Sequence, residues 1–354
     1  MQKRRYTWQT HQVTRETKDA VTIAFDTGGE AFEYLPGQFI NISLMVDGKK
    51  LTRSYSLSSS PGIDPYPAIT IKRVGEGLMS NYLIRYAGKI PEWEIEGPYG
   101  SFVPMESSYQ NSPVVLLSGG SGITPLLSMA KSLLSRSPTM QLTLLYANRS
   151  WYDVIFADAI EALTLQYKER LTVFHALSQH DGTSLAFTGH LIEERLSKLL
   201  VKKVLKQVIP GNLSDTHFFM CGPNGLMKIY QDALAALEVP EERIFMERFI
   251  VDDETIELPD VPEVPCEVLV HFYEQSHLIT IPPGTTLLNA ALNEGIAFRY
   301  SCKTGTCGSC FALLTSGRVS MVKNYALTPE EVARGMILLC QSYPLTEDVT
   351  IELD

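Results

Sequence analysis

Short runs in which apolar and polar residues alternate dominate the first 108 residues. Ala20–Phe25, Gln38–Leu44 and Ile69–Val74 follow this pattern, which is typical of strands with one buried face. Gly, Pro, Asp and Ser residues separate the runs and indicate turns. The pattern predicts an antiparallel β-barrel for residues 1–108.

The pattern changes over residues 109–250, where continuous apolar runs alternate with amphipathic ones. Val114–Leu117, Gln141–Tyr146, Leu171–Leu177 and His217–Met220 read as fully buried strands. Helical spacing follows in the segment from Leu226 to Leu237. Buried strands that alternate with helices predict an α/β domain with a doubly wound parallel sheet.

A linker and a smaller α+β domain are predicted for the rest of the chain. Residues 251–265 contain Pro259, Pro262 and Pro265 together with acidic residues and no Lys or Arg, a composition typical of an extended linker. Residues 266–354 form the third expected domain. Its expected elements are strands at Cys266–Phe272 and Val349–Leu353 and a helix at Thr286–Glu294.

Charge narrows the range of partners. The net charge is −10, which argues against nucleic acid. The segment Val251–Asp354 alone carries 15 acidic and 5 basic residues, so we expect a protein partner with a basic docking face, unless the acidic surface serves only solubility. No apolar run is long enough to span a membrane, and none follows the basic N-terminus. We therefore expect a cytoplasmic protein without a membrane partner.

Four of the six cysteines have a diagnostic spacing. Cys302, Cys307 and Cys310 follow the pattern C-x4-C-x2-C, and 29 residues separate Cys310 from Cys340. This spacing is that of plant-type 2Fe–2S ferredoxins, in which a tight loop directs three thiolates at one cluster and a distant thiolate completes it. Zinc and disulfides are the alternatives, although structural zinc sites usually pair their cysteines differently. Cys266 stands apart and reads as a packing residue.

Two polar segments of the predicted barrel suit a flavin. In the first, Arg53-Ser54-Tyr55-Ser56-Leu57, an Arg can bind phosphate and a Tyr can lie against a flavin ring. In the second, Lys72–Ser80, glycines precede a predicted helix at Leu78–Tyr86, whose N-terminus is a natural anion site. Two phosphate sites favour FAD over FMN.

Two glycine-containing turns of the α/β segment suit a nicotinamide nucleotide. Ser118-Gly119-Gly120-Ser121-Gly122-Ile123-Thr124-Pro125 follows a predicted strand and opens a helix, with Thr124 as the expected cap. Cys221-Gly222-Pro223 ends another strand, where a thiol at the carboxyl edge of the sheet could touch a nicotinamide ring. A buried inert cysteine is the alternative for Cys221.

The order of these motifs resembles the ferredoxin–NADP reductase superfamily, and the C-terminal cysteine loop resembles the reductase components of oxygenases. The resemblance runs from about Val13 to Leu353. Similarity to the reductase subunits of phenylacetyl-CoA epoxidases is carried by Ile71–Gly77, Ser121–Leu126, Tyr146–Ser150 and Met321–Pro344.

The resemblance implies a multidomain chain with a flavin barrel, an α/β NAD(P) domain and a β-grasp ferredoxin domain. The residues that it assigns are the following. The flavin would be held by Arg53, Ser54, Tyr55 and Ser56, and by Ile71, Lys72, Gly77, Leu78, Met79 and Ser80 around its pyrophosphate. The nucleotide would bind at Gly120, Gly122, Thr124, Pro125, Arg149, Ser150, Gly222 and Pro223, with Cys221 and Phe249 at the reacting rings. Iron would be bound by Cys302, Cys307, Cys310 and Cys340.

One departure from the superfamily leaves the choice between NADPH and NADH open. Ser178-Gln179 stands where many NADPH-dependent members have a Ser-Arg pair that binds the 2′-phosphate. Arg149 is still available for a phosphate.

The expected function is electron transfer from NAD(P)H through FAD and a 2Fe–2S cluster to an oxygenase, with phenylacetyl-CoA epoxidase as the first candidate. A Rieske dioxygenase or a hybrid-cluster protein is an alternative acceptor. A zinc-stabilised binding module is an alternative of another class. Hydride transfer needs no general acid or base, so the sequence leads us to name no catalytic carboxylate.

Overall fold

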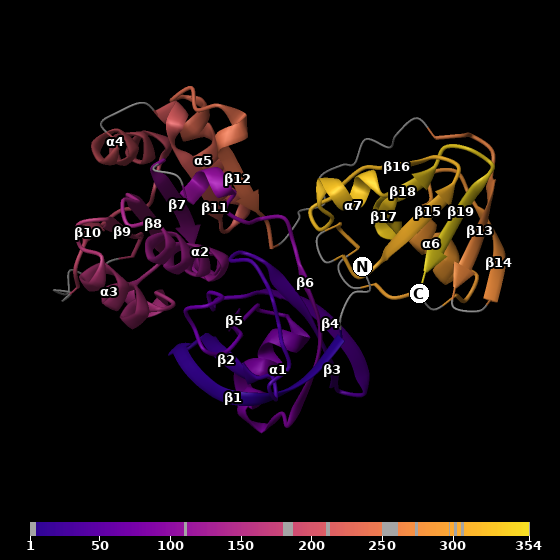
Figure 1. Cartoon of the computed structure of the whole chain (residues 1–354), viewed down its shortest axis with the longest axis horizontal. Helices are drawn as coiled ribbons and strands as arrows, with labels where there is room; N and C mark the ends of the chain where they lie inside the picture. Colours follow the sequence, from indigo (N-terminus) through magenta and orange to yellow (C-terminus); the bar gives the residue numbers. More distant parts are fainter. Residues whose placement is uncertain are drawn as a thin grey trace. The chain divides into compact units, whose positions relative to one another are not determined.

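The computed structural model describes residues 5–109, 112–179, 187–209, 213–249, 261–272, 275–296, 298–300, 303–305 and 308–353. Contacts divide the chain into two compact units (Figure 1). The first unit consists of Met1–Lys50, Tyr55–Pro98 and Phe102–Ile250, and the second consists of Leu51–Ser54, Tyr99–Ser101 and Val251–Asp354. Each unit is described by itself.

A curved antiparallel sheet opens the chain, in the strand order β4-β3-β6-β1-β2-β5. Helix α1 (Leu78–Tyr86) follows β5, and Figure 1 shows the sheet curving around it. The bounds of the strands are β1 Arg5–Thr17, β2 Ala20–Asp26, β3 Phe39–Val46, β4 Lys49–Ser56, β5 Ala68–Lys72 and β6 Glu92–Tyr99. The expected antiparallel barrel is confirmed.

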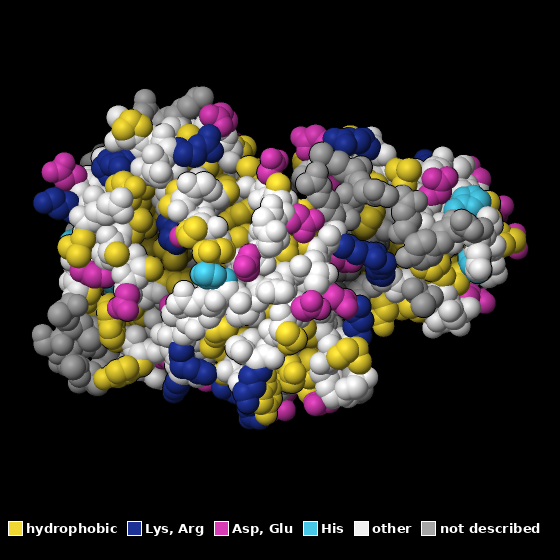
Figure 2. Space-filling model, turned by 60° about the horizontal axis from the view of Figure 1, so that its bottom comes forward, with side chains coloured by type: hydrophobic (Ala, Val, Ile, Leu, Met, Phe, Trp, Pro, Cys, Tyr) yellow, Lys and Arg dark blue, Asp and Glu magenta, His cyan; other side chains and the backbone are white. Residues whose placement is uncertain are grey.

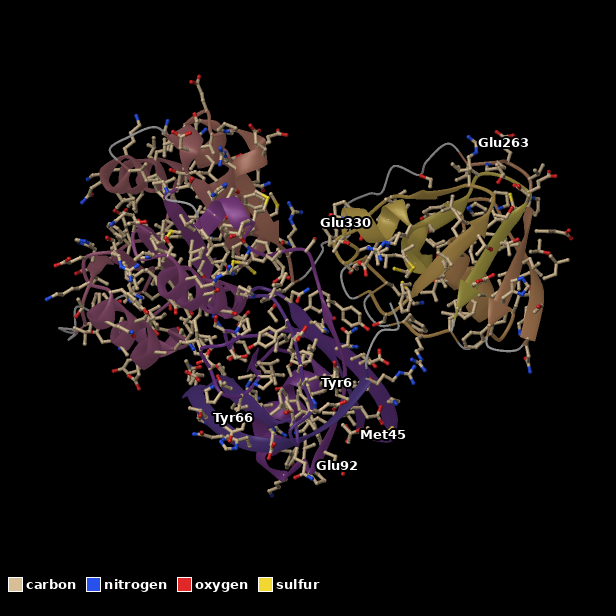
Figure 3. All side chains as sticks on the ribbon, viewed as in Figure 1. Tyr6, Met45, Tyr66, Glu92, Glu263 and Glu330 are labelled. Atoms are coloured by element: carbon tan, nitrogen blue, oxygen red, sulfur yellow. The ribbon has the colours of Figure 1, made fainter. Side chains whose placement is uncertain are left out.

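Two tryptophans lie in the middle of the apolar core of this sheet. Trp8 of β1 and Trp93 of β6 are paired in register, and neither is accessible to solvent. The ring of Phe25 from β2 packs against both, with centroids 5.6 and 5.5 Å away. The indole N–H of Trp93 donates to Thr10 Oγ1 at 2.8 Å, so the ring is held in orientation as well as buried. In Figure 3, Tyr6 and Glu92 lie on these two strands.

A parallel sheet follows, in the order β10-β9-β8-β7-β11-β12. The bounds of its strands are β7 Val114–Gly119, β8 Leu142–Asn148, β9 Leu171–Leu177, β10 His190–Ile192, β11 His217–Cys221 and β12 Ile244–Glu247. The strand order reverses direction between β7 and β11, so the carboxyl ends of these two strands form a switch point at which α/β sheets bind ligands. The predicted doubly wound sheet is confirmed.

Helices cover both faces of the parallel sheet. Helices α2 (Ile123–Arg136) and α3 (Ala157–Gln166) pack in one apolar core, and α4 (Lys198–Val208) and α5 (Asn224–Ala235) pack in another. Within the described residues, no helix is long and apolar enough to cross a membrane.

Three polar contacts join the antiparallel sheet to the α/β layers. Lys131 of α2 contacts both carboxylate oxygens of Asp64 at 2.9 Å. The hydroxyl of Ser128 donates to the Ser59 carbonyl at 2.5 Å. The N–H of Phe156, the residue before α3, donates to Glu16 Oε2 at 3.3 Å. These contacts join the antiparallel and the parallel parts of the first unit.

The second unit is a mixed five-stranded sheet with an adjacent two-stranded sheet. The larger sheet has the order β14-β13-β19-β15-β17, and α6 packs on it. The bounds are β13 Cys266–Phe272, β14 Gln275–Ile281, α6 Leu287–Asn293, β15 Phe311–Ser316, β16 Val319–Met321, α7 Pro329–Ala333, β17 Met336–Leu338, β18 Ser342–Pro344 and β19 Val349–Leu353. Strands β13 and β19 pair in parallel and their other neighbours are antiparallel, as in the expected β-grasp domain.

Surface charge is mixed on the first unit. On the face that Figure 2 shows, Lys and Arg side chains lie among Asp and Glu side chains. This agrees with the sequence, in which the acidic excess comes from residues 251–354. Residues 251–260 of the predicted linker lie outside the described residues, and the four domain boundaries stay predictions.

We expect Lys131→Met to lower the free energy of unfolding of the first unit by about 1–2 kcal/mol, because it leaves the half-buried Asp64 carboxylate with only its bond from the Ser60 N–H. Urea unfolding measures this. Lys228→Met is the control, since Lys228 pairs with Asp232 on an exposed helix face and should change stability by at most about 0.5 kcal/mol. Equal effects of the two substitutions would contradict the role given to Lys131.

Candidate functional site

The loop after β7 is a compact backbone turn. Gly120–Gly122 form a single 3₁₀ turn that leads into α2, and Gly120 has a φ of +53°, a region that favours glycine. The Tyr146 hydroxyl donates to the Gly120 carbonyl at 2.9 Å and accepts from the Ile155 N–H at 3.3 Å. The predicted cap is wrong: Thr124 lies inside α2, where its hydroxyl donates to the Ser121 carbonyl at 2.7 Å.

The two glycine-containing turns, about 100 residues apart in sequence, meet backbone to backbone. A Cβ on Gly122 would lie 2.0 Å from the Cys221 carbonyl oxygen, and one on Gly222 would lie 3.1 Å from the Gly119 nitrogen. Parallel pairing places Cys221 beside Ser118. The hydroxyl of Ser118 is buried and has no hydrogen-bond partner in the described part of the chain. A glycine-rich turn at a helix N-terminus fits a pyrophosphate group.

A second turn of this kind precedes α1. Asn81 donates to the carbonyls of Val74, Gly75 and Gly77 at 3.0, 3.0 and 2.9 Å, and Ser80 Oγ accepts from the Val74 N–H at 3.1 Å. The N-cap of α1 is Gly77, and no side chain caps the helix. The N–H groups of the first turn are therefore available to an anion, as the sequence predicts for the flavin pyrophosphate.

Lys72 lies between the two turns. It ends β5, and its Nζ would be 3.2 Å from a Cβ on Gly120. Burial lowers the pKa of the Lys72 ammonium, whereas the charge of Asp153 raises it. Its neighbour Arg73 is paired with Asp19 at 2.9 Å, while Lys72 has no salt bridge within the described ranges. The sequence assigned Lys72 to the flavin pyrophosphate, and the structure adds the Gly120 turn to its surroundings.

The flavin motif lies on β4. The Arg53 guanidinium is exposed and donates to the Thr52 carbonyl at 2.8 Å, so most of its N–H groups face outward. The division between the two units falls between Ser54 and Tyr55. Ser56 is 6% exposed, and its hydroxyl donates to Glu247 Oε2 at 3.0 Å, which ties the motif to the end of β12.

Glu247 is the functional candidate that sequence reasoning missed. Parallel pairing sets it beside Cys221, so three groups converge: the Ser56 hydroxyl, the Glu247 carboxyl and the Cys221 thiol. The residue is half-buried, but its carboxyl group is enclosed by protein. Burial raises the pKa of Glu247 to about 8, while the hydrogen bond from Ser56 lowers it. The only signal in the sequence was its position two residues before Phe249, which the resemblance assigns to the reacting rings.

Cys221 stays a neutral thiol in this setting. Its side chain is inaccessible to solvent, and burial, with a smaller contribution from the charge of Glu247, raises its pKa well above the usual value. Nucleophilic thiols have lowered pKa values. Cys221 is therefore unsuited to nucleophilic chemistry, and its contact with a nicotinamide ring stays a prediction.

The remaining predicted nucleotide residues follow β8 and β12. The Gln179 N–H donates to the Arg149 carbonyl at 2.7 Å, so the positions that bear on the choice of nucleotide are adjacent. Ser150 forms a capping box with Asp153. Phe249 lies two residues after Glu247 in the sequence, and its apolar ring is 44% exposed.

The predicted iron site is described in part. Cys302 and Cys307 lie outside the described residues, while Cys310 and Cys340 are 2% and 5% exposed. The Leu339 N–H donates to the Cys310 carbonyl at 2.9 Å, which brings the two ligand-bearing segments together. Gly305 and Gly308 have φ values of +80° and +68°, as a tight ligand loop requires. Two buried thiols beside such a loop fit a thiolate-bound cluster.

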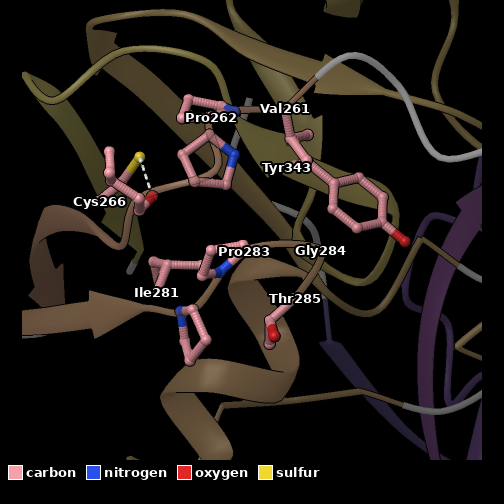
Figure 4. Close-up of a pocket in the computed structure, with 11 residues that line it drawn as sticks. Val261, Pro262, Cys266, Ile281, Pro283, Gly284, Thr285 and Tyr343 are labelled. Atoms are coloured by element: carbon pink, nitrogen blue, oxygen red, sulfur yellow. Dashed lines mark hydrogen bonds between the residues drawn. The ribbon is translucent and has the colours of Figure 1, made fainter.

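A shallow pocket of the second unit lies around Cys266 and Tyr343 (Figure 4). Four of its lining residues are prolines. The Cys266 thiol contacts the Val264 carbonyl at 3.9 Å, and burial raises its pKa. The lining contains no Asp, Glu, Lys or Arg, so Cys266 acts as a packing residue there.

Three families of domains match the chain in succession. Residues 8–103 match the oxidoreductase FAD-binding domain, residues 116–232 the oxidoreductase NAD-binding domain, and residues 271–345 the 2Fe–2S iron–sulfur cluster binding domain. The chain is therefore an oxidoreductase with FAD, a nicotinamide nucleotide and a 2Fe–2S cluster as its cofactors.

Relatives of full length share this organisation. The ferredoxin reductase component of 3-ketosteroid-9-alpha-monooxygenase from Mycobacterium tuberculosis is 33% identical over 98% of this chain and 95% of its own length. A subunit of the 1,2-phenylacetyl-CoA epoxidase from Escherichia coli is 31% identical over 97% and 96%. The glycine betaine monooxygenase reductase subunit of Pseudomonas aeruginosa is 31% identical over 96% and 93%. This chain belongs to the family of reductase components that these proteins represent.

Solved structures agree on the fold. Phthalate dioxygenase reductase aligns with a TM-score of 0.56 and 21% identity, over 99% of this chain and 98% of that one. An intact type IV self-sufficient cytochrome P450 monooxygenase aligns with a TM-score of 0.71 and 20% identity, over 99% of this chain and 41% of that one.

The raised pKa of Glu247 predicts how stability depends on pH. A carboxyl with a pKa of about 8 in the folded chain and 4.5 in the unfolded chain holds its proton more tightly when folded. The resulting stabilisation is complete below pH 4.5 and is lost as pH rises through 8. Between pH 6 and pH 9, wild type should therefore lose about 1–3 kcal/mol relative to Glu247→Gln.

Urea unfolding at the two pH values measures this difference. Glu242→Gln, which changes an exposed carboxylate, should track wild type at both. A constant difference between Glu247→Gln and wild type would show that the Glu247 carboxyl is ordinary.

Proposed function

We propose that this chain passes electrons from NADPH or NADH, through FAD and a 2Fe–2S cluster, to an oxygenase component. The observation that carries the proposal is the junction of Ser56, Cys221 and Glu247, where the motif assigned to the flavin meets the motif assigned to the nicotinamide. When bound, the flavin can take two electrons together and release them singly to a one-electron cluster.

The proposed role of the protein residues is positioning. The turn at Gly120–Gly122 and the N-terminus of α2 hold the nucleotide pyrophosphate, and Lys72 adds a positive charge beside them. The N-terminus of α1 holds the flavin pyrophosphate, and Arg53 keeps its sequence-based assignment to a flavin phosphate. The buried Cys221 thiol and Phe249 set the two rings against each other, with Ser56 and Glu247 as hydrogen-bonding groups at the ring edge.

Phenylacetyl-CoA epoxidase is the acceptor that we propose first. Support comes from the four sequence segments that resemble its reductase subunits and from the Escherichia coli relative at 31% identity. The relatives named for ketosteroid and glycine betaine monooxygenases are about as similar over similar lengths, so another oxygenase, such as a Rieske dioxygenase, is the second candidate. The match to the 2Fe–2S family argues against a zinc-stabilised binding module. The proposed compartment is the cytoplasm, where the cluster thiols stay reduced.

An anaerobic absorption spectrum tests the proposal directly. The purified protein should show flavin bands with a broad red shoulder from the cluster, and NADPH or NADH, titrated separately, should bleach both. The nucleotide that bleaches them at the lower concentration is the donor. A folded protein without visible bands would overturn the proposal.

Cys310→Ser should separate the two halves of the electron path. We expect loss of cytochrome c reduction by at least about 100-fold, because the cluster needs all four thiolates. Ferricyanide reduction, which the flavin supports alone, should stay within about twofold of wild type. Cys266→Ser, which alters a buried thiol outside the spacing motif, is the matched control and should keep both activities. Cytochrome c reduction that survives in Cys310→Ser would refute the ligand assignment.

A further inference from the structure

Gln341 occupies an unusual place in the second unit. It directly follows Cys340 and lies between β17 and β18 (Figure 1). Its side chain is 4% exposed although it is polar. A buried amide needs hydrogen-bond partners, or its burial costs stability.

The partners of this amide belong to both cysteine-bearing segments. Gln341 Nε2 donates to the Lys303 carbonyl at 2.9 Å and to the Cys340 carbonyl at 3.0 Å, which uses both of its hydrogens. Lys303 follows Cys302 in the loop, and Cys340 is the distant cysteine of the motif. One side chain thus connects two segments that are 38 residues apart.

Lys303, whose carbonyl accepts the hydrogen bond from Gln341, has an uncommon backbone conformation. Lys303 has a φ of +58°, in the left-handed region that residues other than glycine seldom adopt. Such a conformation persists only where its surroundings impose it. The hydrogen bond from Gln341 to the carbonyl of this residue is one such constraint.

The stem of Gln341 supports the next turn of the loop. A Cβ on Gly305 would lie 3.1 Å from Gln341 Cγ and 2.9 Å from the Lys323 carbonyl oxygen. The Gly305 carbonyl accepts from the Tyr325 N–H at 3.0 Å, and the Val322 N–H donates to the Gln341 carbonyl at 3.0 Å. Gly305 therefore packs against Gln341 and against the segment 322–325, and a side chain at position 305 would not fit.

The bond to Lys303 also fixes a neighbouring N–H group. In a trans peptide the C=O and N–H point in opposite directions, so a Lys303 carbonyl held by Gln341 turns the Thr304 N–H away from Gln341. Hydrogen bonds from backbone N–H groups to sulfur are among the factors that set the reduction potential of such clusters. A loop free to rotate this peptide would lose that control.

We propose that Gln341 is a positioning residue of the iron–sulfur site, whose amide joins the segment 303–305 to the Cys340 segment. The inference rests on the proposed ligation of the cluster by the four cysteines. It assigns the stability and the potential of the cluster to a side chain that does not bind iron.

Gln341→Leu tests this inference in the full-length holoprotein, because leucine keeps the apolar stem and removes both donors. We expect the cluster to be lost to an iron chelator about tenfold faster than from wild type, as two absent hydrogen bonds imply. Redox titration followed by electron paramagnetic resonance should show a shifted midpoint potential. Flavin content and ferricyanide reduction by the nucleotide should be unchanged.

Two further variants sharpen the test. Gln341→Glu keeps the shape but sets a carboxylate against two carbonyls, so it should lose the cluster faster than Gln341→Leu. Gln275→Leu alters an exposed glutamine of the β14 hairpin and should match wild type. If Gln341→Leu folds, as its flavin absorbance and circular dichroism would show, but takes up no cluster, the proposal is supported.

A wild-type rate of cluster loss and a wild-type potential in Gln341→Leu would overturn the proposal. This outcome differs from failure of the proposed function, in which wild type itself would hold no cluster. If Gln341→Leu and Gln341→Glu both lose the cluster at the wild-type rate, Gln341 contributes to packing alone and the proposal is likewise overturned.

Discussion

The close approach of two backbone turns is the constraint on which the candidate site depends. Gly122 meets the Cys221 carbonyl at a distance that excludes any Cβ, and this contact is possible because β7 and β11 are paired in parallel and end together. The same register continues to β12 and sets Glu247 beside Cys221. The aligned ends also accept a hydrogen bond from Ser56 of the antiparallel sheet. A side chain at position 122 would separate the turns and, with them, the groups that converge at the junction.

Much of this arrangement follows from local sequence pattern. The alternation at Ala20–Phe25 and the continuous apolar runs of the second segment predict β2 and the parallel strands, because burial on one face or on both leaves a periodic signature. The helix at Leu78–Tyr86 has the predicted bounds, since glycines precede it and apolar residues follow at helical spacing. Cysteine spacing predicts a cluster because the geometry of thiolate ligation restricts the length of the loop. The family match to a 2Fe–2S domain agrees with that prediction.

The features that the sequence did not predict depend on contacts between distant residues. Nothing near Glu247 in the sequence indicates that its carboxyl is enclosed by β4 and β11 and keeps its proton to about pH 8. Gln341 reads as a polar residue after a cysteine, and its link to Lys303 appears only when the loop is folded. The wrong prediction of Thr124 as the N-cap of α2 has the same origin. The Thr124 hydroxyl suits an N-cap. The N-cap in the structure is Gly122, a position at which only glycine fits against the Cys221 carbonyl.

Charge in the first unit is arranged so that each part of the proposed cofactors meets a suitable group. The Lys72 ammonium lies beside the Gly120 turn that is assigned to a phosphate, where a positive charge lowers the free energy of a bound anion. The groups at the proposed ring junction are neutral at physiological pH: burial keeps the Cys221 thiol and the Glu247 carboxyl protonated. An ionised carboxylate at that position would repel the phosphates of a nucleotide bound close by and would itself be costly to bury. In the proposed mode of binding, the protonated groups at the junction and the Lys72 cation beside the Gly120 turn favour one orientation of the nucleotide, with its phosphates at that turn and its ring against Cys221.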